Sequence, residues 1–124
     1  MVLLRALADR RTAKQIAGDA GEEQALLFLQ KQGLTLVARN FRCKGGEVDL
    51  IMLDRHSLVF IEVRKRTDAR YGGAAASITT RKQARLVLAA QTFLQRYKVQ
   101  PACRFDVVAL DGTTMDWLKN AIES

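Results

Sequence analysis

Two carboxyl groups interrupt segments of the chain that are otherwise apolar. Asp49 lies within residues 48–53 (VDLIML), and Glu62 lies within residues 58–63 (LVFIEV). Strands that are apolar on both faces are usually central and covered on both sides, so both acids are expected to be buried. A buried carboxylate without a partner is costly, and it normally takes up a proton, pairs with a cation or binds a metal ion. These two residues are therefore the first candidates for a chemical role.

A turn at residues 54–57 would place these acids side by side. In the antiparallel pairing that this turn predicts, Asp49 faces Glu62 and Glu47 faces Arg64, with opposed Cβ atoms about 5 Å apart on one face. Side chains alternate along a strand, so Glu47 and Asp49 share that face. The sequence therefore predicts a single cluster of three acids and one arginine.

The predicted cluster has two interpretations. Adjacent carboxylates repel each other unless one holds a proton or a cation lies between them, and a hard divalent cation, Mg²⁺ or Mn²⁺, suits a site made only of oxygen ligands. Alternatively, Arg64 neutralises Asp49 and Glu62 in a structural ion-pair network, because such networks also perturb carboxylates. The residues alone leave both interpretations open.

Basic residues surround the acidic cluster in the sequence. Residues 39–85 contain eleven Lys and Arg against five Asp and Glu, an excess of +6 in a chain whose net charge is +7. Cations that hold a nucleic-acid backbone around metal-binding carboxylates are expected of a protein that hydrolyses phosphodiesters. An ordinary solvated basic surface is the alternative. The predicted nucleic-acid-binding residues are Arg42, Lys44, Lys65, Arg66, Arg70, Arg81, Lys82 and Gln83.

The elements that carry these residues follow from hydrophobic patterning, caps and turns. The predicted helices cover residues 13–32 and 79–97, and the predicted strands cover 35–41, 47–53, 58–65, 104–110 and 114–118. The order α-β-β-β-α-β-β is typical of an α/β domain with a mixed β-sheet flanked by helices. Residues 13–120 are expected to form this single domain after a flexible N-terminal segment, residues 1–12. Gly18 and Gly21 predict that the first helix approaches the sheet closely, because each glycine costs about 1 kcal/mol in a helix interior.

Length and composition limit the class of protein. The 124 residues suffice for one domain, and 48% hydrophobic with 27% charged residues excludes fibrous and largely disordered classes. No apolar run is long enough to cross a bilayer, and the start of the chain lacks the pattern of a signal peptide, so we expect a cytoplasmic protein without membrane contact. Two distant cysteines and one histidine argue against a zinc site or a disulfide framework.

Several short motifs match a known family over about residues 14–118. They are residues 46–51 (GEVDLI), 59–66 (VFIEVRKR), 18–22 (GDAGE), 71–74 (YGGA), 82–83 (KQ) and 104–108 (RFDVV). Together they resemble the YraN family of uncharacterised bacterial proteins, which is similar to archaeal Holliday-junction resolvases and to the wider PD-(D/E)XK nuclease superfamily. The resemblance implies a restriction-endonuclease-like core of order α-β-β-β-α-β.

The resemblance also implies roles for individual residues. Asp49 matches the motif aspartate and Glu62 the acidic residue of the (D/E)XK motif, and both would be metal ligands. Glu22 on the first helix matches an acid that completes the site in resolvase-like members, and Glu47 is a neighbouring candidate. These four residues and Arg64 form the predicted catalytic set. Asp49, Glu62 and Glu22 are the predicted ligands of Mg²⁺ or Mn²⁺.

Arg64 departs from the family pattern because it occupies the position of the motif lysine. Arginine stays protonated and cannot act as a base, although it can bind a phosphate group through two hydrogen bonds. Lys65 follows it, but alternation turns Lys65 to the opposite face of the sheet. Activation of water would therefore fall to the metal, which lowers the pKa of bound water.

Two functions of different classes follow from these residues. The first is a divalent-metal-dependent endonuclease-like protein that hydrolyses DNA phosphodiester bonds through metal-activated water. The second is a catalytically weak or inactive nucleic-acid-binding module on a nuclease scaffold, which Arg64 favours. A third, an RNA- or ribosome-associated factor, would have a purely structural acidic cluster. We expect DNA as the partner more than RNA and, by analogy with resolvase-like relatives, a homodimer.

Overall fold

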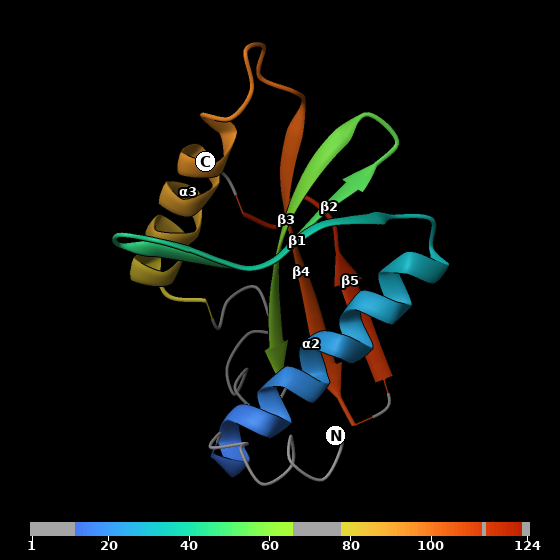
Figure 1. Ribbon diagram of the computed structural model, residues 1–124. Coiled ribbons are helices and arrows are strands. Elements are labelled where there is room, and N and C mark those ends of the chain that lie inside the picture. Colours follow the sequence, from blue (N-terminus) through green and yellow to red (C-terminus); the bar gives the residue numbers. More distant parts are fainter. Residues whose placement is uncertain (1–11, 66–77, 113, 123–124) are drawn as a thin grey trace, which may run out of the picture.

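The computed structural model describes residues 12–65, 78–112 and 114–122. Its helices and strands are α2 (Ala13–Lys31), β1 (Thr35–Cys43), β2 (Gly46–Asp54), β3 (Ser57–Lys65), α3 (Thr80–Leu94), β4 (Cys103–Asp111) and β5 (Thr114–Leu118). This order confirms the predicted α-β-β-β-α-β-β arrangement (Figure 1). Apart from Thr12, the predicted flexible segment of residues 1–12 lies outside the described residues. In the described parts of the chain, neither helix has the length and apolar character needed to cross a membrane.

The five strands form one mixed sheet in the order β1-β2-β3-β4-β5. β3 and β4 run parallel, because the chain between them crosses back through α3, and the other neighbouring strands run antiparallel. The two helices cover opposite faces of the sheet. Buried residues of α3 pack in one core with Phe60 of β3, and buried residues of α2 pack in a second core with Ile61 (Figure 1). The apolar strand β3 is thus central and covered on both sides, as predicted.

Helix α2 begins at a capping box. Oγ1 of Thr12 accepts a hydrogen bond from the amide of Gln15 at 3.1 Å, and the Gln15 side chain accepts one from the amide of Thr12 at 2.8 Å. The helix reaches the sheet at Gly21, where a Cβ atom would lie 2.9 Å from Cδ1 of Leu110. The predicted close approach is therefore confirmed for Gly21. It is wrong for Gly18, because no atom of the described residues, which include every strand of the sheet, lies within 4 Å of the position of its Cβ.

Helix α3 begins after Thr79, whose Oγ1 accepts a hydrogen bond from the amide of Lys82 at 3.2 Å. The helix ends at Leu94 and not at Tyr97, the predicted end. Beyond Leu94, the amides of Arg96 and Tyr97 bond to carbonyl groups three residues earlier instead of four. This tightening of the last turn ends the α-helix before its apolar pattern ends.

The hairpin of β1 and β2 extends beside α3 (Figure 1). β1 continues two residues beyond its predicted end at Phe41, and the two-residue turn ends in Gly45, which has a φ of +86°. Gly46 then lies directly against the helix. A Cβ atom there would clash with the carbonyl oxygen of Arg85 and lie 3.0 Å from the amide nitrogen of Ala89. Glycine at this position therefore lets the hairpin pack on the backbone of α3.

The sheet also contains a buried acid whose carboxylate is fully hydrogen-bonded within the protein. Asp106 of β4 is fully buried and accepts hydrogen bonds from Nε of Arg104 at 3.1 Å, Nε1 of Trp117 at 2.9 Å and the amide of Asn120 at 2.8 Å. Arg104 also donates to Asp54 at 2.9 Å. Both oxygens of Asp106 are bonded within the protein, so this cluster is structural.

Candidate active site

Strands β2 and β3 separate at Asp49. Their ladder follows the predicted register as far as Leu50 opposite Ile61, but the predicted backbone pair of Asp49 with Glu62 is absent from the described ladder. Instead, Oδ2 of Asp49 accepts a hydrogen bond from the backbone amide of Val63 at 2.8 Å. The Asp49 carboxylate thus bonds the β3 backbone beyond the end of the described ladder.

The side chain of Asp49 interacts with two other carboxyl groups, which come from different elements of the fold. The two groups belong to Glu62 on β3 and Glu22 on α2. Burial raises the pKa of Asp49, and the hydrogen bond from the amide of Val63 opposes this by stabilising the ionised carboxylate. The structure therefore brings together the three acids that the family resemblance implies.

The two flanking acids hold protons more tightly than exposed glutamates. Burial, followed by the charge of Asp49, raises the pKa of Glu62 to about 8, although the positive charges of Arg64 and Lys82 act in the opposite direction. The same two causes raise the pKa of Glu22 to about 7. At neutral pH the three acids thus share protons unless a further positive charge reaches them.

Arg64 does not neutralise the cluster by direct pairing. Its charge acts on Glu62, yet in the described chain no ion pair within 4.0 Å joins Arg64 to Asp49 or Glu62. The structural ion-pair network, which was the alternative interpretation of the sequence, is therefore not formed among the described residues.

Oε2 of Glu22 and Nε of Arg64 are buried polar atoms without a hydrogen-bond partner among the described residues. Buried polar groups are nearly always bonded, and an unsatisfied one costs about 1–3 kcal/mol. One of these atoms is a carboxylate oxygen and the other a guanidinium nitrogen. Atoms of these two types fit a site that receives both a cation and an anion.

The donor set suits a hard divalent cation. Glu22, Asp49 and Glu62 offer only carboxylate oxygens, which are the ligands that Mg²⁺ and Mn²⁺ prefer. As these side chains stand, no group of three or more His, Cys, Asp or Glu residues in the described chain converges to hold a metal ion. The acids meet in two pairs that share Asp49. Coordination by all three would therefore require rotation of a glutamate side chain.

Glu47 lines the same cleft as Glu62, but it is more exposed than the other acids, and its predicted pair with Arg64 is absent from the described ladder. It is opposite Arg42 of β1 in the ladder, and its Oε2 lies 3.7 Å from Nε of that arginine, with 53% of the Glu47 side chain exposed. Its charge still contributes to the raised pKa of Asp49. Glu22 takes its place in the cluster, which geometry within the hairpin could not predict because Glu22 comes from a helix.

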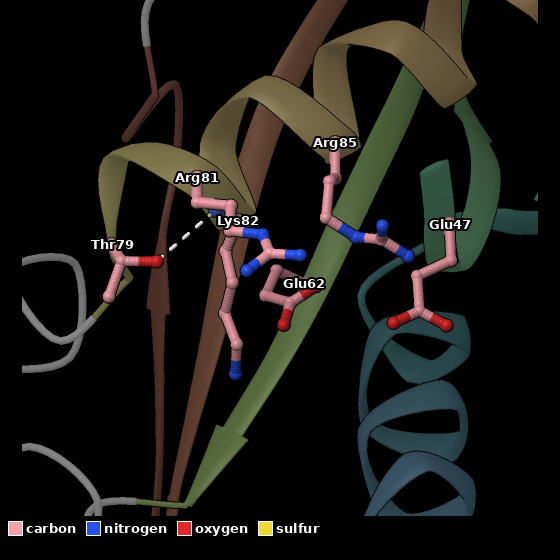
Figure 2. Close-up of a pocket in the computed structure, with 6 residues that line it drawn as sticks. All are labelled: Glu47, Glu62, Thr79, Arg81, Lys82 and Arg85. Atoms are coloured by element: carbon pink, nitrogen blue, oxygen red, sulfur yellow. Dashed lines mark hydrogen bonds between the residues drawn. The ribbon is translucent and has the colours of Figure 1, made fainter. Parts of the chain in front are cut away.

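A cleft of about 320 Å³ opens beside the acidic cluster, between the strands and the first turns of α3 (Figure 2). Its lining residues are Glu47, Glu62, Thr79, Arg81, Lys82 and Arg85. Three cations of α3 thus face two acids of the strands. Arg85 was not among the predicted residues, although its position four residues after Arg81 places both on one side of the helix and could have identified it.

The other predicted nucleic-acid-binding residues lie outside this cleft. Arg42 and Lys44 are exposed near the tip of the hairpin. Lys65 lines a groove with residues of α2 and β4, on the face opposite the cleft, as its alternation with Arg64 predicts.

Gln83 has a bond within the protein. Its side-chain amide donates to the carbonyl oxygen of Ile78 at 3.0 Å and so holds the segment that enters α3. Arg66 and Arg70, which were also predicted to bind nucleic acid, lie outside the described residues. Of the predicted basic residues, Arg81 and Lys82 are those that line the cleft.

Comparison with known proteins places the chain in a family. The model of the uncharacterised protein family UPF0102 matches residues 21–110, which include all three acids of the cluster. A UPF0102 protein of Herminiimonas arsenicoxydans is 68% identical over 114 residues, which cover 92% of this chain and 92% of that protein. A UPF0102 protein of Janthinobacterium sp. (strain Marseille) is 65% identical over 114 residues, covering 92% and 93%. Another, of Ralstonia pickettii (strain 12J), is 54% identical over 109 residues, covering 84% and 87%. The chain therefore belongs to the uncharacterised protein family UPF0102, the YraN family that its motifs resemble.

Proposed function

We propose that this protein is an endonuclease-like enzyme that hydrolyses DNA phosphodiester bonds with Mg²⁺ or Mn²⁺. The observation that carries the proposal is the contact of Asp49 with Glu62 and Glu22 beside a cleft lined by cations. The charge of Asp49 raises the pKa of Glu62 and of Glu22, and acids with a perturbed pKa beside a cleft are candidates for a functional site. The adjoining positive charge gives this site the chemistry of a phosphate-binding one.

Asp49, Glu62 and Glu22 would hold the divalent cation. When bound, such a cation lowers the pKa of a water molecule and neutralises charge on the phosphate. The amide of Val63 keeps Asp49 oriented and favours its ionised form. A positive charge among the acids would also lower the pKa of Glu62 and Glu22 toward ordinary values, because it favours their ionised forms.

Arg64 and the cations of α3 would bind the substrate. Nε of Arg64 has no partner within the described protein, so it is able to donate to a phosphate oxygen. Arg81, Lys82 and Arg85 line the cleft and would hold the nucleic-acid backbone by charge. Binding should therefore be largely independent of base sequence and should weaken as salt is added.

The test is cleavage of end-labelled four-way junction, flap and single-stranded DNA in Mg²⁺ or Mn²⁺. We expect Asp49→Ala and Glu62→Ala to lower the rate at least about 100-fold, the loss that follows removal of one transition-state interaction. Glu23→Ala is the matched control, because Glu23 is an acid of α2 whose partner is the exposed Arg39, 2.7 Å away. Cleavage by both cluster variants at the wild-type rate would show that the catalytic assignment is wrong.

One observation favours a second function, a nucleic-acid-binding module without turnover. Arg64 stands where the motif has lysine, and its guanidinium stays protonated at neutral pH and cannot act as a base. Salt-sensitive DNA binding in EDTA, with no cleavage in Mg²⁺ or Mn²⁺, would select this function.

If RNA displaces DNA in a competition assay, an RNA-associated role gains support over both the endonuclease and the DNA-binding module. The homodimer proposed by analogy is tested by light scattering of the purified protein.

A further inference from the structure

The motif strand β3 supplies no lysine to the acidic cluster. Arg64 occupies the position next to Glu62 on that face, and Lys65 lines the groove on the opposite face with residues of α2. Hydrolysis is accelerated by positive charges and hydrogen-bond donors that lie where negative charge develops on the phosphate. Arg64 can donate to the phosphate from β3, and the cations that line the cleft come from another element, α3.

Lys82 of α3 enters the cleft from the side opposite β3. Figure 2 shows its side chain extending into the same cleft as the carboxylate of Glu62. The first turn of α3 holds its backbone, since the amide of Lys82 donates to Oγ1 of Thr79 at 3.2 Å. The helix start and its cap therefore fix the origin of a side chain whose four-carbon stem remains free to move.

The ammonium group of Lys82 is near the acids without being locked to one of them. Its charge lowers the pKa of Glu62, so the two groups interact. Yet no ion pair within 4.0 Å joins Lys82 to any acid in the described segments of the chain. A cation in this state can reach a phosphate bound between Glu62 and α3 without first breaking an ion pair.

We infer that Lys82 is a catalytic residue that takes the part of the motif lysine from a different element of the fold. The inference rests on the proposed function. In hydrolysis the oxygen of water bonds to phosphorus and the bond from phosphorus to the leaving ester oxygen breaks. The attacking water gives up one proton, and the leaving oxygen takes one. Lys82 donates hydrogen bonds to a non-bridging phosphate oxygen as its negative charge grows, and it stays protonated throughout.

The test compares Lys82→Met and Lys82→Arg with the wild-type protein on whichever of the three DNA substrates the wild type cleaves fastest. Lys98→Met is the matched control, because Lys98 is an exposed lysine beyond the other end of α3. We expect Lys82→Met to lower kcat about 100- to 1,000-fold. DNA affinity measured by fluorescence anisotropy in EDTA should change less than about tenfold, as expected for one phosphate contact. Lys82→Arg should retain at least about ten times the activity of Lys82→Met, because it keeps the charge.

Each outcome decides a different point. If the wild type cleaves and Lys82→Met has a kcat within about threefold of it, the assignment of Lys82 is overturned and the proposed function stands. The assignment also fails if Lys82→Arg is no more active than Lys82→Met, or if the loss lies wholly in DNA affinity. If the wild type cleaves none of the substrates while it binds them in EDTA, the proposed function is overturned and the inference with it.

Discussion

Replacing Glu62 with glutamine should stabilise the metal-free protein, and the gain should grow with pH. In the folded protein burial and Asp49 raise the pKa of Glu62 from 4.5 to about 8. The folded state therefore binds this proton more tightly than the unfolded chain does. The stability that the proton contributes is fully present below about pH 4.5 and is lost as the pH rises through about 8.

The size of the effect follows from the proton affinities. A tenfold difference in proton affinity corresponds to about 1.4 kcal/mol. Relative to pH 4, the wild type should lose at most about 3 kcal/mol at pH 7 and about 5 kcal/mol at pH 9 through Glu62 alone. This loss is a large part of the free energy of unfolding of a typical domain, which is roughly 5–15 kcal/mol. Glutamine has the size of the protonated acid and cannot ionise, so Glu62→Gln should recover the loss.

Urea unfolding followed by circular dichroism, in EDTA at about pH 5, 7 and 9, measures the difference. Glu23→Gln is the control: the side chain of Glu23 is 49% exposed and pairs with Arg39. Glu23→Gln should change the free energy of unfolding by no more than about 1 kcal/mol at every pH. If Glu62→Gln is no more stable than the wild type at pH 9, or if its advantage does not grow with pH, the reasoning about repulsion in the cluster is refuted.

Further predictions concern packing, the buried network and DNA binding. Gly46→Ala should cost about 1–3 kcal/mol in free energy of unfolding, because its Cβ would clash with the backbone of α3. Gly18→Ala should gain up to about 1 kcal/mol, because no atom of the described residues lies within 4 Å of its Cβ. Equal effects of the two substitutions in urea titrations would contradict this packing. Asp106→Ala should cost about 3–5 kcal/mol, since Arg104 loses its buried partner, and a loss below about 1 kcal/mol in the same assay would show that the network is not structural. Arg81→Gln should reduce the slope of log Kd for DNA against log salt by about 1, measured by anisotropy between about 50 and 200 mM NaCl. An unchanged slope would place the DNA backbone away from Arg81.

Local patterns in the sequence predict most of the fold. The turn at residues 54–57 determines which residues of β2 and β3 face each other, and the ladder keeps that register as far as Leu50 and Ile61. The separation of the strands at Asp49 was not predictable in this way. The hairpin also packs against α3 at Gly46, a contact between residues far apart in the chain that local spacing does not predict.

The acids of the site were predictable to different degrees. Asp49 and Glu62 stand out because ionisable groups within apolar strands conflict with their surroundings. Glu22 has no such signal, since it lies on a helix in a polar segment and no spacing rule relates a helix position to a neighbouring strand. The family resemblance was needed to include it. The predicted pair of Glu47 with Arg64 is not formed in the described ladder, where Glu47 lies opposite Arg42 of β1.

Anomalous scattering from a crystal of the protein grown with Mn²⁺ would test cation binding most directly. We expect one strong peak between the carboxylates of Asp49 and Glu62, with the Glu22 side chain turned toward it. Ordered carboxylates with no Mn²⁺ between them, bridged by Arg64 instead, would contradict the proposed metal-dependent chemistry.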